Sequence, residues 1–309
     1  MKSHTIVTAA DGRYTLQAQV LALSLARTQT TATRLVVQGN DWTTKERDRL
    51  VRLGTGNLSV ECLAVDDSKF ADIRLTNGFP IATAYNILAP RHLFGDLDRL
   101  LYVDADVVVR KDLASLFQMD NETGISACLD AHIGWVANPT MWRPWKEESL
   151  EPFSPYLNTG VMLIDPPRWN ERRLTEETVS YLRKYDLPCV DQDALNLVLR
   201  GEFGTLRPAY NSMPYHILSA FRHIDLVTPS DQISEALTDP AIVHFHRSFL
   251  GKPWELGCIH PARNLWRTLA DEIHPRWRRK VDLVGLGRRK AAAAARMLRM
   301  DEQAESLDW

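Results

Sequence analysis

The sequence contains few cysteines and no excess of charge of one sign. Its four cysteines are widely spaced and form no C-x-x-C pair, so they indicate neither a zinc site nor a disulfide framework. The 37 basic and 39 acidic residues give a formal net charge of −2. Because no global field would attract nucleic acid, we expect no nucleic-acid partner, and any electrostatic function must be local.

Long apolar stretches are also missing. No stretch approaches the ~20 apolar residues that a membrane-spanning helix needs, and the first residues, MKSHTIVTAADG, lack the apolar core of a signal peptide. We therefore expect the protein to be made and kept in the cytoplasm. With 309 residues, 45% of them hydrophobic, the chain can bury a large core as one α/β domain with an appendage.

Strand-like and helix-like segments alternate along the chain, which favours a parallel sheet flanked by helices. Neither G-x-G-x-x-G nor a Walker loop follows any expected strand, which disfavours a dinucleotide enzyme or a P-loop NTPase. We expect strands at residues 6–10, 34–38, 58–63, 100–103, 107–109, 124–129, 156–165, 206–211 and 241–246. We expect helices at residues 14–25, 43–53, 80–94, 113–119 and 260–269, with others beginning near residues 166 and 191.

The segment 98–112, DRLLYVDADVVVRKD, places two carboxylates inside an apolar strand. Asp104 and Asp106 are two residues apart, so on an extended chain both side chains point the same way. Two buried anions repel each other and no Lys or Arg stands between them, so a divalent cation bound through oxygen is the economical solution. A strand end with one solvated Asp would explain a bare D-x-D about equally well.

The flanking residues carry a resemblance. With LLYV before it and VVV after it, the motif resembles the metal-binding D-x-D of glycosyltransferase family 8, which includes bacterial lipopolysaccharide galactosyl- and glucosyltransferases and relatives of glycogenin. Residues 156–165, with N-x-G, and residues 188–196, with D-Q-D, resemble the family in the same order. The resemblance implies a GT-A-type α/β fold, with a mixed, mainly parallel sheet flanked by helices, over residues 1–272.

The resemblance also implies a UDP-sugar donor and Mn²⁺, with Mg²⁺ as an alternative cofactor. In the family, the Asp after the first strand contacts the uracil base, the nearby Tyr ring stacks on it, and a Lys in a Lys-Pro-Trp pattern holds the diphosphate. The matching donor-binding residues are Thr8, Ala9, Asp11, Tyr14, Asn86, Asp104, Ala105, Asp106, Asn158, Thr159 and Lys252. An ordinary strand, turn and helix with a turn Asp would explain residues 8–14 without a nucleotide.

The third protein ligand of the metal is implied to be a histidine, and two candidates stand two residues apart. The segment leading to Lys252 is two residues longer than usual, so His246 fits the usual spacing, whereas His244 fits the strand pattern. We choose His244 with Asp104 and Asp106, a mixed oxygen and nitrogen set that suits Mn²⁺. A lone strand histidine is more often structural.

The sugar side is implied by a second set of polar residues. The catalytic candidates are Asp130, Asp191, Gln192 and Asp193. Asp130, Asn158 and Gln192 would position the sugar. Gln192 is a poor nucleophile, and Asp191 or Asp193 is only a candidate, so front-side attack assisted by the leaving phosphate stays open. As purely structural residues, Asp191 or Asp193 would cap the helix that starts there.

The chain departs from the family at Asn86, where relatives usually carry an Arg that reaches the donor's phosphate and sugar. An amide cannot form a charge-assisted fork with phosphate, so the donor pose or the sugar differs unless Arg13, Arg74 or Arg91 compensates.

Two segments bear on the acceptor. Residues 131–154 are irregular and rich in Trp, as in a lid or acceptor loop, although a satellite hydrophobic cluster would look the same. Residues 276–299 hold nine Lys or Arg against Asp282 alone. We expect residues 273–309 to be a helical basic appendage, either a solvated tail or an anchor on the anionic inner face of a membrane.

These patterns together predict a metal-dependent, retaining enzyme. It would move a hexosyl group, galactose or glucose, from a UDP-sugar to a hydroxyl of a glycan or glycolipid acceptor such as lipopolysaccharide core. A sugar-nucleotide hydrolase or nucleotidyltransferase could use the same D-x-D motif, and a non-catalytic UDP-binding scaffold would keep the fold and lose the metal.

Overall fold

The computed structural model describes residues 3–70, 72–73, 80–93, 97–134, 136, 144–217, 228–248 and 250–277. The strands are β1 His4–Ala9, β2 Thr33–Gly39, β3 Leu58–Ala64, β4 Leu100–Val103, β5 Val107–Val109, β6 Ile125–Leu129, β7 Leu157–Ile164, β8 Gly204–Thr205 and β9 Ile242–His244. The α-helices are α1 Thr15–Thr28, α2 Thr44–Val51, α3 Tyr85–His92, α4 Pro166–Glu171, α5 Leu174–Lys184, α6 Val190–Leu199, α8 Ser230–Thr238 and α9 Arg263–Ile273.

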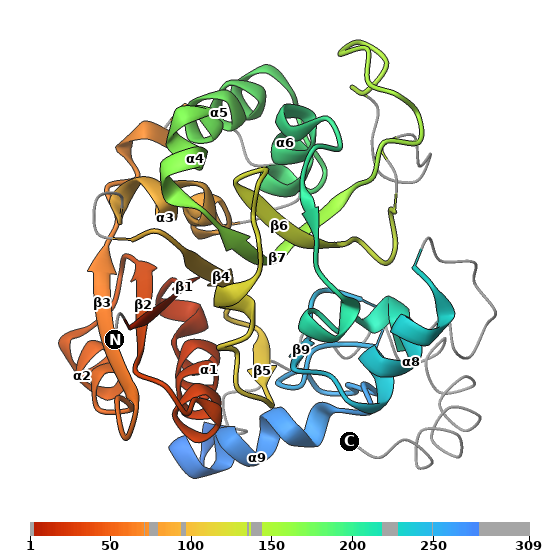
Figure 1. Ribbon diagram of the computed structural model, residues 1–309. Coiled ribbons are helices and arrows are strands. Elements are labelled where there is room, and N and C mark those ends of the chain that lie inside the picture. Colours follow the sequence, from red (N-terminus) through yellow and green to blue (C-terminus); the bar gives the residue numbers. More distant parts are fainter. Residues whose placement is uncertain are drawn as a thin grey trace.

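Seven strands form one sheet in the order β3-β2-β1-β4-β7-β6-β8, while β5 and β9 form a separate two-stranded ribbon (Figure 1). The pairs β3-β2, β2-β1, β1-β4 and β6-β8 are parallel, whereas β7 runs antiparallel to both β4 and β6. The expected mixed, mainly parallel α/β fold is therefore confirmed. Every residue of β4 and β7 is buried, as their unbroken apolar runs require.

The two faces of the sheet are covered by different helices. Alternate strand residues divide between two clusters: Val7 and Tyr102 pack with α3, α5 and α6, whereas Ile6 and Leu101 pack with α1 and Leu50 of α2. The helix α9 packs on α1 at the lower edge of the molecule, next to the β5-β9 ribbon (Figure 1). Both faces of the central strands are thus closed to water, which leaves the strand ends as the place for a polar site.

Local signals in the sequence explain several boundaries. Thr43 begins α2 with a capping box, in which its side chain accepts from the Glu46 N–H and the Glu46 carboxylate accepts from the Thr43 N–H. The segment expected as a helix at 80–94 begins as a 3₁₀ turn, Ile81–Ala84, and continues as α3.

Two expected elements are wrong. Residues 113–119 contain only the 3₁₀ turn Leu116–Gln118. Residues 206–211 are not a strand: β8 ends at Thr205, and Pro208–Tyr210 is a 3₁₀ turn. Pro208 explains the second difference, because it has no N–H for a sheet ladder and its fixed φ suits the first residue of a helical turn.

The C-terminal part of the described chain packs onto the domain. Trp277 is buried, its ring lies 5.1 Å from that of Trp266 in an edge-to-face contact, and its N–H donates to Asp271 at 2.8 Å. Trp277, which belongs to the expected appendage 273–309, therefore packs on the domain. The rest of the basic segment lies outside the described residues, as do Trp135 and Trp142 of the segment 131–154.

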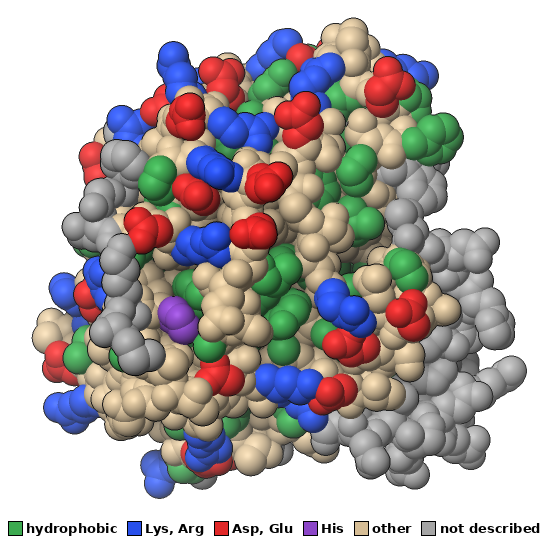
Figure 2. Space-filling model, viewed as in Figure 1, with side chains coloured by type: hydrophobic (Ala, Val, Ile, Leu, Met, Phe, Trp, Pro, Cys, Tyr) green, Lys and Arg blue, Asp and Glu red, His purple; other side chains and the backbone are tan. Residues whose placement is uncertain are grey.

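The surface agrees with the near-neutral composition. On the face shown in Figure 2, Lys and Arg side chains alternate with Asp and Glu rather than gathering in one patch. Within the described ranges, no helix has the length and the apolar content needed to cross a bilayer. All four cysteines, Cys62, Cys128, Cys189 and Cys258, are free thiols.

Two neighbouring residues of α2 test the packing. Leu50 is fully buried against α1 and the sheet, whereas Val51 is 49% exposed. Leu50→Ala should lower the free energy of unfolding by about 2–5 kcal/mol, through lost burial and a cavity. The control Val51→Ala should change it by less than ~0.5 kcal/mol, since nothing packs there to be lost. Urea unfolding followed by circular dichroism measures both, and equal midpoints for the two variants would contradict this account of the core.

Candidate functional site

The candidate site lies where the parallel strands β1 and β4 end side by side. In open α/β sheets ligands bind outside the carboxyl ends of the strands, and a cavity of about 210 Å³ lies there. The expected donor-binding residues in its wall are Ala9, Asp11, Tyr14, Asp104, Ala105, Asp106 and Lys252. Thr8, by contrast, is buried within β1 and does not line this cavity.

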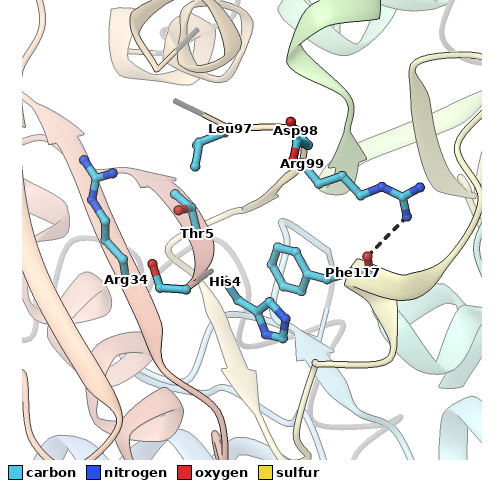
Figure 3. A pocket seen from close by; sticks show the side chains of 8 residues that line it. His4, Thr5, Arg34, Leu97, Asp98, Arg99 and Phe117 are labelled. Carbon is cyan, nitrogen blue, oxygen red and sulfur yellow. Dashed lines mark hydrogen bonds between the residues drawn. The ribbon is translucent and has the colours of Figure 1, made fainter. Parts of the chain in front are cut away.

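A second cavity, of about 540 Å³, lies at the opposite ends of these strands, near the start of β1 and just before β4 (Figure 3). Its wall includes the stacked rings of His4 and Phe117 and two arginines. Both arginines are engaged, Arg34 with Glu61 and Arg99 with the carbonyl of Phe117 (Figure 3). Because it shares no residue with the expected donor site, we assign the chemistry to the smaller cavity.

The turn after β1 is organised by Asp11. Its carboxylate accepts from the backbone N–H groups of Arg13 at 3.0 Å and Tyr14 at 3.1 Å, and its other oxygen forms an ion pair with the Arg13 side chain at 2.8 Å. The structural role of a turn Asp is therefore present whether or not a base binds. Arg13 is held by Asp11, so it is not free to replace the charge missing at Asn86.

The two carboxylates of the D-x-D motif converge through a turn. The expectation that they lie on extended chain is wrong, because β4 ends at Val103 and β5 leaves the sheet from Val107. The antiparallel pairing of β5 with β9 sets His244 opposite Val107. As a result, the Nε2 atom of His244 lies 3.2 Å from Asp106 Oδ1 and 3.5 Å from Asp104 Oδ2.

This Asp104, Asp106 and His244 cluster has the donor atoms of a divalent metal site. One ligand atom from each residue lies within 4.8 Å of the others. Two carboxylate oxygens and one imidazole nitrogen suit Mn²⁺ or Mg²⁺, and they leave coordination positions for water and phosphate oxygens. The residues therefore fit the ion that the sequence analysis expected.

Lys252 supplies a positive charge beside Asp106, a carboxylate that has no Lys or Arg near it in the sequence of the D-x-D motif. Its ammonium group contacts Asp106 Oδ2 and lies 5.8 Å from the centre of the Tyr14 ring. Burial acts to raise the pKa of Asp106, but Lys252 and His244 hold that pKa well below its usual range. Burial raises the pKa of Asp104 to about 6. Asp106 is thus the carboxylate that the chain itself keeps ionised.

The tautomer of His244 is set by Asn211. The Asn211 amide donates to Asn158 Oδ1 at 2.8 Å, so its oxygen is left to accept from His244 Nδ1 at 2.9 Å. With Nδ1 engaged by Asn211, Nε2 is the nitrogen that faces the two carboxylates, and it can serve as a metal ligand once it carries no proton. Asn211 itself is fully buried behind the histidine.

Gly160 and His246 complete this part of the site. A Cβ atom at position 160 would lie 2.2 Å from Cε1 of His244 and would collide with the imidazole. Glycine is therefore required here so that the His244 ring can approach the backbone. His246 lies in the cavity wall, with its ring 5.2 Å from that of His244, and burial lowers its pKa to about 3. Among the described residues, the cluster that could bind a metal ion contains His244 and not His246.

Next to this cluster lie the polar side chains that the sequence analysis expected to position the sugar. Asn158 Nδ2 donates to Asp130 Oδ2 at 2.9 Å and to Gln192 Oε1 at 3.0 Å. Gln192 donates in turn to Asp130 at 3.1 Å, and its oxygen also accepts from the Thr159 N–H at 3.1 Å. Asp130, Asn158, Thr159 and Gln192 are therefore brought together in one hydrogen-bonded group.

The two acids beside Gln192 face different partners. Asp193 accepts from the Tyr156 hydroxyl and from the Cys189 N–H at 2.7 Å, so it caps α6 from inside its first turn, and Cys189 rather than an Asp is the N-cap residue. Asp191 accepts from the Asn86 amide at 2.6 Å. Burial raises the pKa of each acid to about 7. In the described part of the chain, no Lys or Arg contacts either carboxylate.

A family model described as glycosyl transferase family 8 matches residues 5–257. General stress protein A of Bacillus subtilis is 28% identical over 215 residues, which cover 66% of this chain and 70% of that protein. Lipopolysaccharide 1,2-glucosyltransferase of Escherichia coli strain K12 is 27% identical over 223 residues, which cover 69% of this chain and 61% of that protein.

The fold is similar to that of the solved galactosyltransferase LgtC in complex with donor and acceptor sugar analogs. The TM-score is 0.74 at 23% identity, and the match covers 90% of this chain and 100% of that chain. At this identity the likeness concerns the fold, whereas the family match rests on the sequence over most of the chain. The protein therefore belongs to glycosyl transferase family 8.

Proposed function

We propose that this protein is a metal-dependent, retaining hexosyltransferase that moves galactose or glucose from a UDP-sugar to a hydroxyl of a glycan or glycolipid, such as lipopolysaccharide core. The observation that carries the proposal is the Asp104, Asp106 and His244 cluster beside a cavity at the carboxyl ends of β1 and β4. The names of the relatives support the substrate class, since one is a lipopolysaccharide glucosyltransferase.

The donor would lie across the cavity with its diphosphate at the metal cluster. Asp104, Asp106 and His244 would hold Mn²⁺, which when bound supplies positive charge to the departing diphosphate. Asp11 and Tyr14 would face the uracil base from the turn after β1, with the backbone of residues 8–9 beneath it. Lys252 adds a second positive charge on the same side.

The sugar would lie over the group formed by Asp130, Asn158 and Gln192. Both lone-pair directions of the Gln192 oxygen are taken by donors, and both oxygens of Asp193 are hydrogen bonded. Neither side chain is therefore poised as a nucleophile. We propose front-side attack in place of a covalent intermediate on Asp191: the acceptor oxygen bonds to the anomeric carbon as the bond to the diphosphate breaks, and the acceptor's proton passes to the departing phosphate oxygen.

The sugar side favours a neutral hexose over a hexuronate. Its groups are carboxylates, amides and a buried Asn86 whose oxygen has no hydrogen-bond partner in the described part of the chain. Arg91, a candidate to replace the missing charge, is paired with Glu176, and Arg74 lies outside the described residues. A carboxylate on the donor sugar would meet Asp191 without a compensating cation.

The metal site is tested by the two histidines. His244→Ala removes a proposed ligand, so Mn²⁺ affinity should fall at least about a hundredfold, beyond the 10–100-fold cost typical of losing an outer-shell partner. His246→Ala is the matched control and should stay within about threefold of the wild type. Titration calorimetry with Mn²⁺ measures both. The reverse order of effects would assign the ligand to His246 instead.

Turnover distinguishes the reaction classes. Asp104→Ala and Asp106→Ala should abolish metal-dependent UDP release while leaving the circular dichroism spectrum unchanged. Wild-type release that is equal in EDTA and in Mn²⁺ would refute metal dependence. Rapid release that no acceptor accelerates would favour a sugar-nucleotide hydrolase, and absence of any turnover with intact UDP binding would favour a scaffold.

Donor selectivity is tested at Asn86. The wild type should bind UDP-glucose or UDP-galactose at least ~10-fold more tightly than UDP-glucuronate, because like charges facing each other in a buried site are costly. Asn86→Arg places a cation beside Asp191 and should narrow this gap, whereas Asn86→Gln keeps a neutral amide and should preserve it. Calorimetry in Mn²⁺ gives the affinities, and equal wild-type binding of neutral and acidic donors would refute the proposal.

We place the enzyme in the cytoplasm, on the inner face of a membrane, through the basic segment that follows Trp277. Eight Lys or Arg against one Asp over residues 278–299 would attract anionic lipid by about 1 kcal/mol per cation near the surface. The full chain should co-sediment with anionic vesicles at low salt and be released at high salt. A chain ending at Trp277 keeps its contact with Trp266 and should not bind. Equal binding by both chains would reject the anchor.

A further inference from the structure

The segment between β9 and Lys252 carries a cation with no evident structural task. Arg247 is exposed and lines the proposed donor cavity, and within the described ranges its guanidinium has neither a hydrogen-bond nor an ion-pair partner. The other cations near this cavity are engaged, since Lys252 contacts Asp106 and Arg13 pairs with Asp11. An unpaired arginine on a concave wall is suited to an anionic ligand.

The position of Arg247 identifies which part of a ligand it would meet. It lies in the same cavity wall as Lys252 and the D-x-D turn, whereas Asp191 and Asp193 lie on the sugar side, where no described cation contacts them. His246, directly before it, has Nδ1 3.1 Å from the Arg247 carbonyl, and its ring is held between those of Tyr215 and His244. The backbone that carries Arg247 is thus anchored to the metal side of the cavity.

The charges on that side leave room for a second cation. Lys252 and a divalent ion would carry three positive charges against the two negative charges of Asp104 and Asp106, so only one positive charge would be left to offset a diphosphate. A nucleoside diphosphate brings further negative charge on oxygens that a planar guanidinium can bind with two hydrogen bonds at once. Lysine, as a compact point charge, would not reproduce that fork.

We propose that Arg247 binds the diphosphate of the donor as a cation additional to Lys252 and the metal. The inference rests on the proposed use of a UDP-sugar. Arg247 lies in the segment between β9 and Lys252, three residues after His244. It supplies positive charge on the phosphate side that Asn86 does not.

Three ligands with no, one and two phosphate groups separate the contribution of the phosphates to binding affinity from that of the nucleoside. Calorimetry in Mn²⁺ with uridine, UMP and UDP should show that Arg247→Ala weakens UDP binding on the order of ten- to a hundredfold, as expected for a lost charge-assisted hydrogen bond. Uridine binding should be unchanged, because the nucleoside lacks phosphate. Arg247→Lys should recover part of the UDP affinity. Lys45→Ala, on the exposed side of α2, is the control and should bind all three ligands as the wild type does.

The outcomes distinguish this inference from the proposed function. Wild-type binding of UDP with an Arg247→Ala affinity within about twofold would overturn the role of Arg247 and leave the donor assignment intact. Equal losses for uridine and UDP would also overturn it, since the residue would then serve the nucleoside or the fold. A wild type that binds neither uridine nor UDP would refute the proposed donor and this inference with it.

Discussion

The arrangement of the C-terminal third of the chain depends on compensating one buried carboxylate. Asp106 is 6% exposed, and a buried, unpaired carboxylate costs several kcal/mol after relaxation. The chain supplies Lys252 and His244, both from the segment around and after β9. Bringing them there requires β5 to leave the main sheet and to pair with β9. The two-stranded ribbon therefore places His244 beside Asp106, beyond the carboxyl end of β4, and the segment that follows β9 brings Lys252 to the same carboxylate.

A chain of hydrogen bonds between buried polar side chains connects His244 to the residues expected to position the sugar. His244 is held by Asn211, Asn211 by Asn158, and Asn158 contacts both Asp130 and Gln192. The amides of Asn211, Asn158 and Gln192 each donate and accept, whereas Asp130 only accepts, and in a low-dielectric interior an unmatched polar group would be costly. The orientation of these side chains is thus fixed before any ligand arrives, which is the preorganisation that transferase chemistry needs.

Apolar runs and turn residues predicted most of the strands, and the spacing of Asp104 and Asp106 predicted that they act together. The turn that joins them was not predictable, because the run after it is equally apolar whether it continues β4 or starts β5. The contact between Asp106 and Lys252 spans 146 residues, and Asn211 acquires its place only when β9 lies beside β5. Local sequence patterns do not encode pairings over such distances.

The aspartates of this site have different pKa values because their neighbours differ. Lys252 and His244 keep Asp106 ionised, as metal binding requires. Asp191 and Asp193 have no such partner among the described residues, and burial raises their pKa to about 7, above the unfolded value of 3.8. Near neutral pH each of these two acids is therefore partly protonated. Since the folded state holds these protons more tightly than the unfolded chain, stability contributed at low pH is lost as the pH rises from about 4 through 7. Cations on the phosphate side and uncompensated acids on the sugar side thus divide the cavity by charge, in the order that a diphosphate joined to a neutral sugar would require.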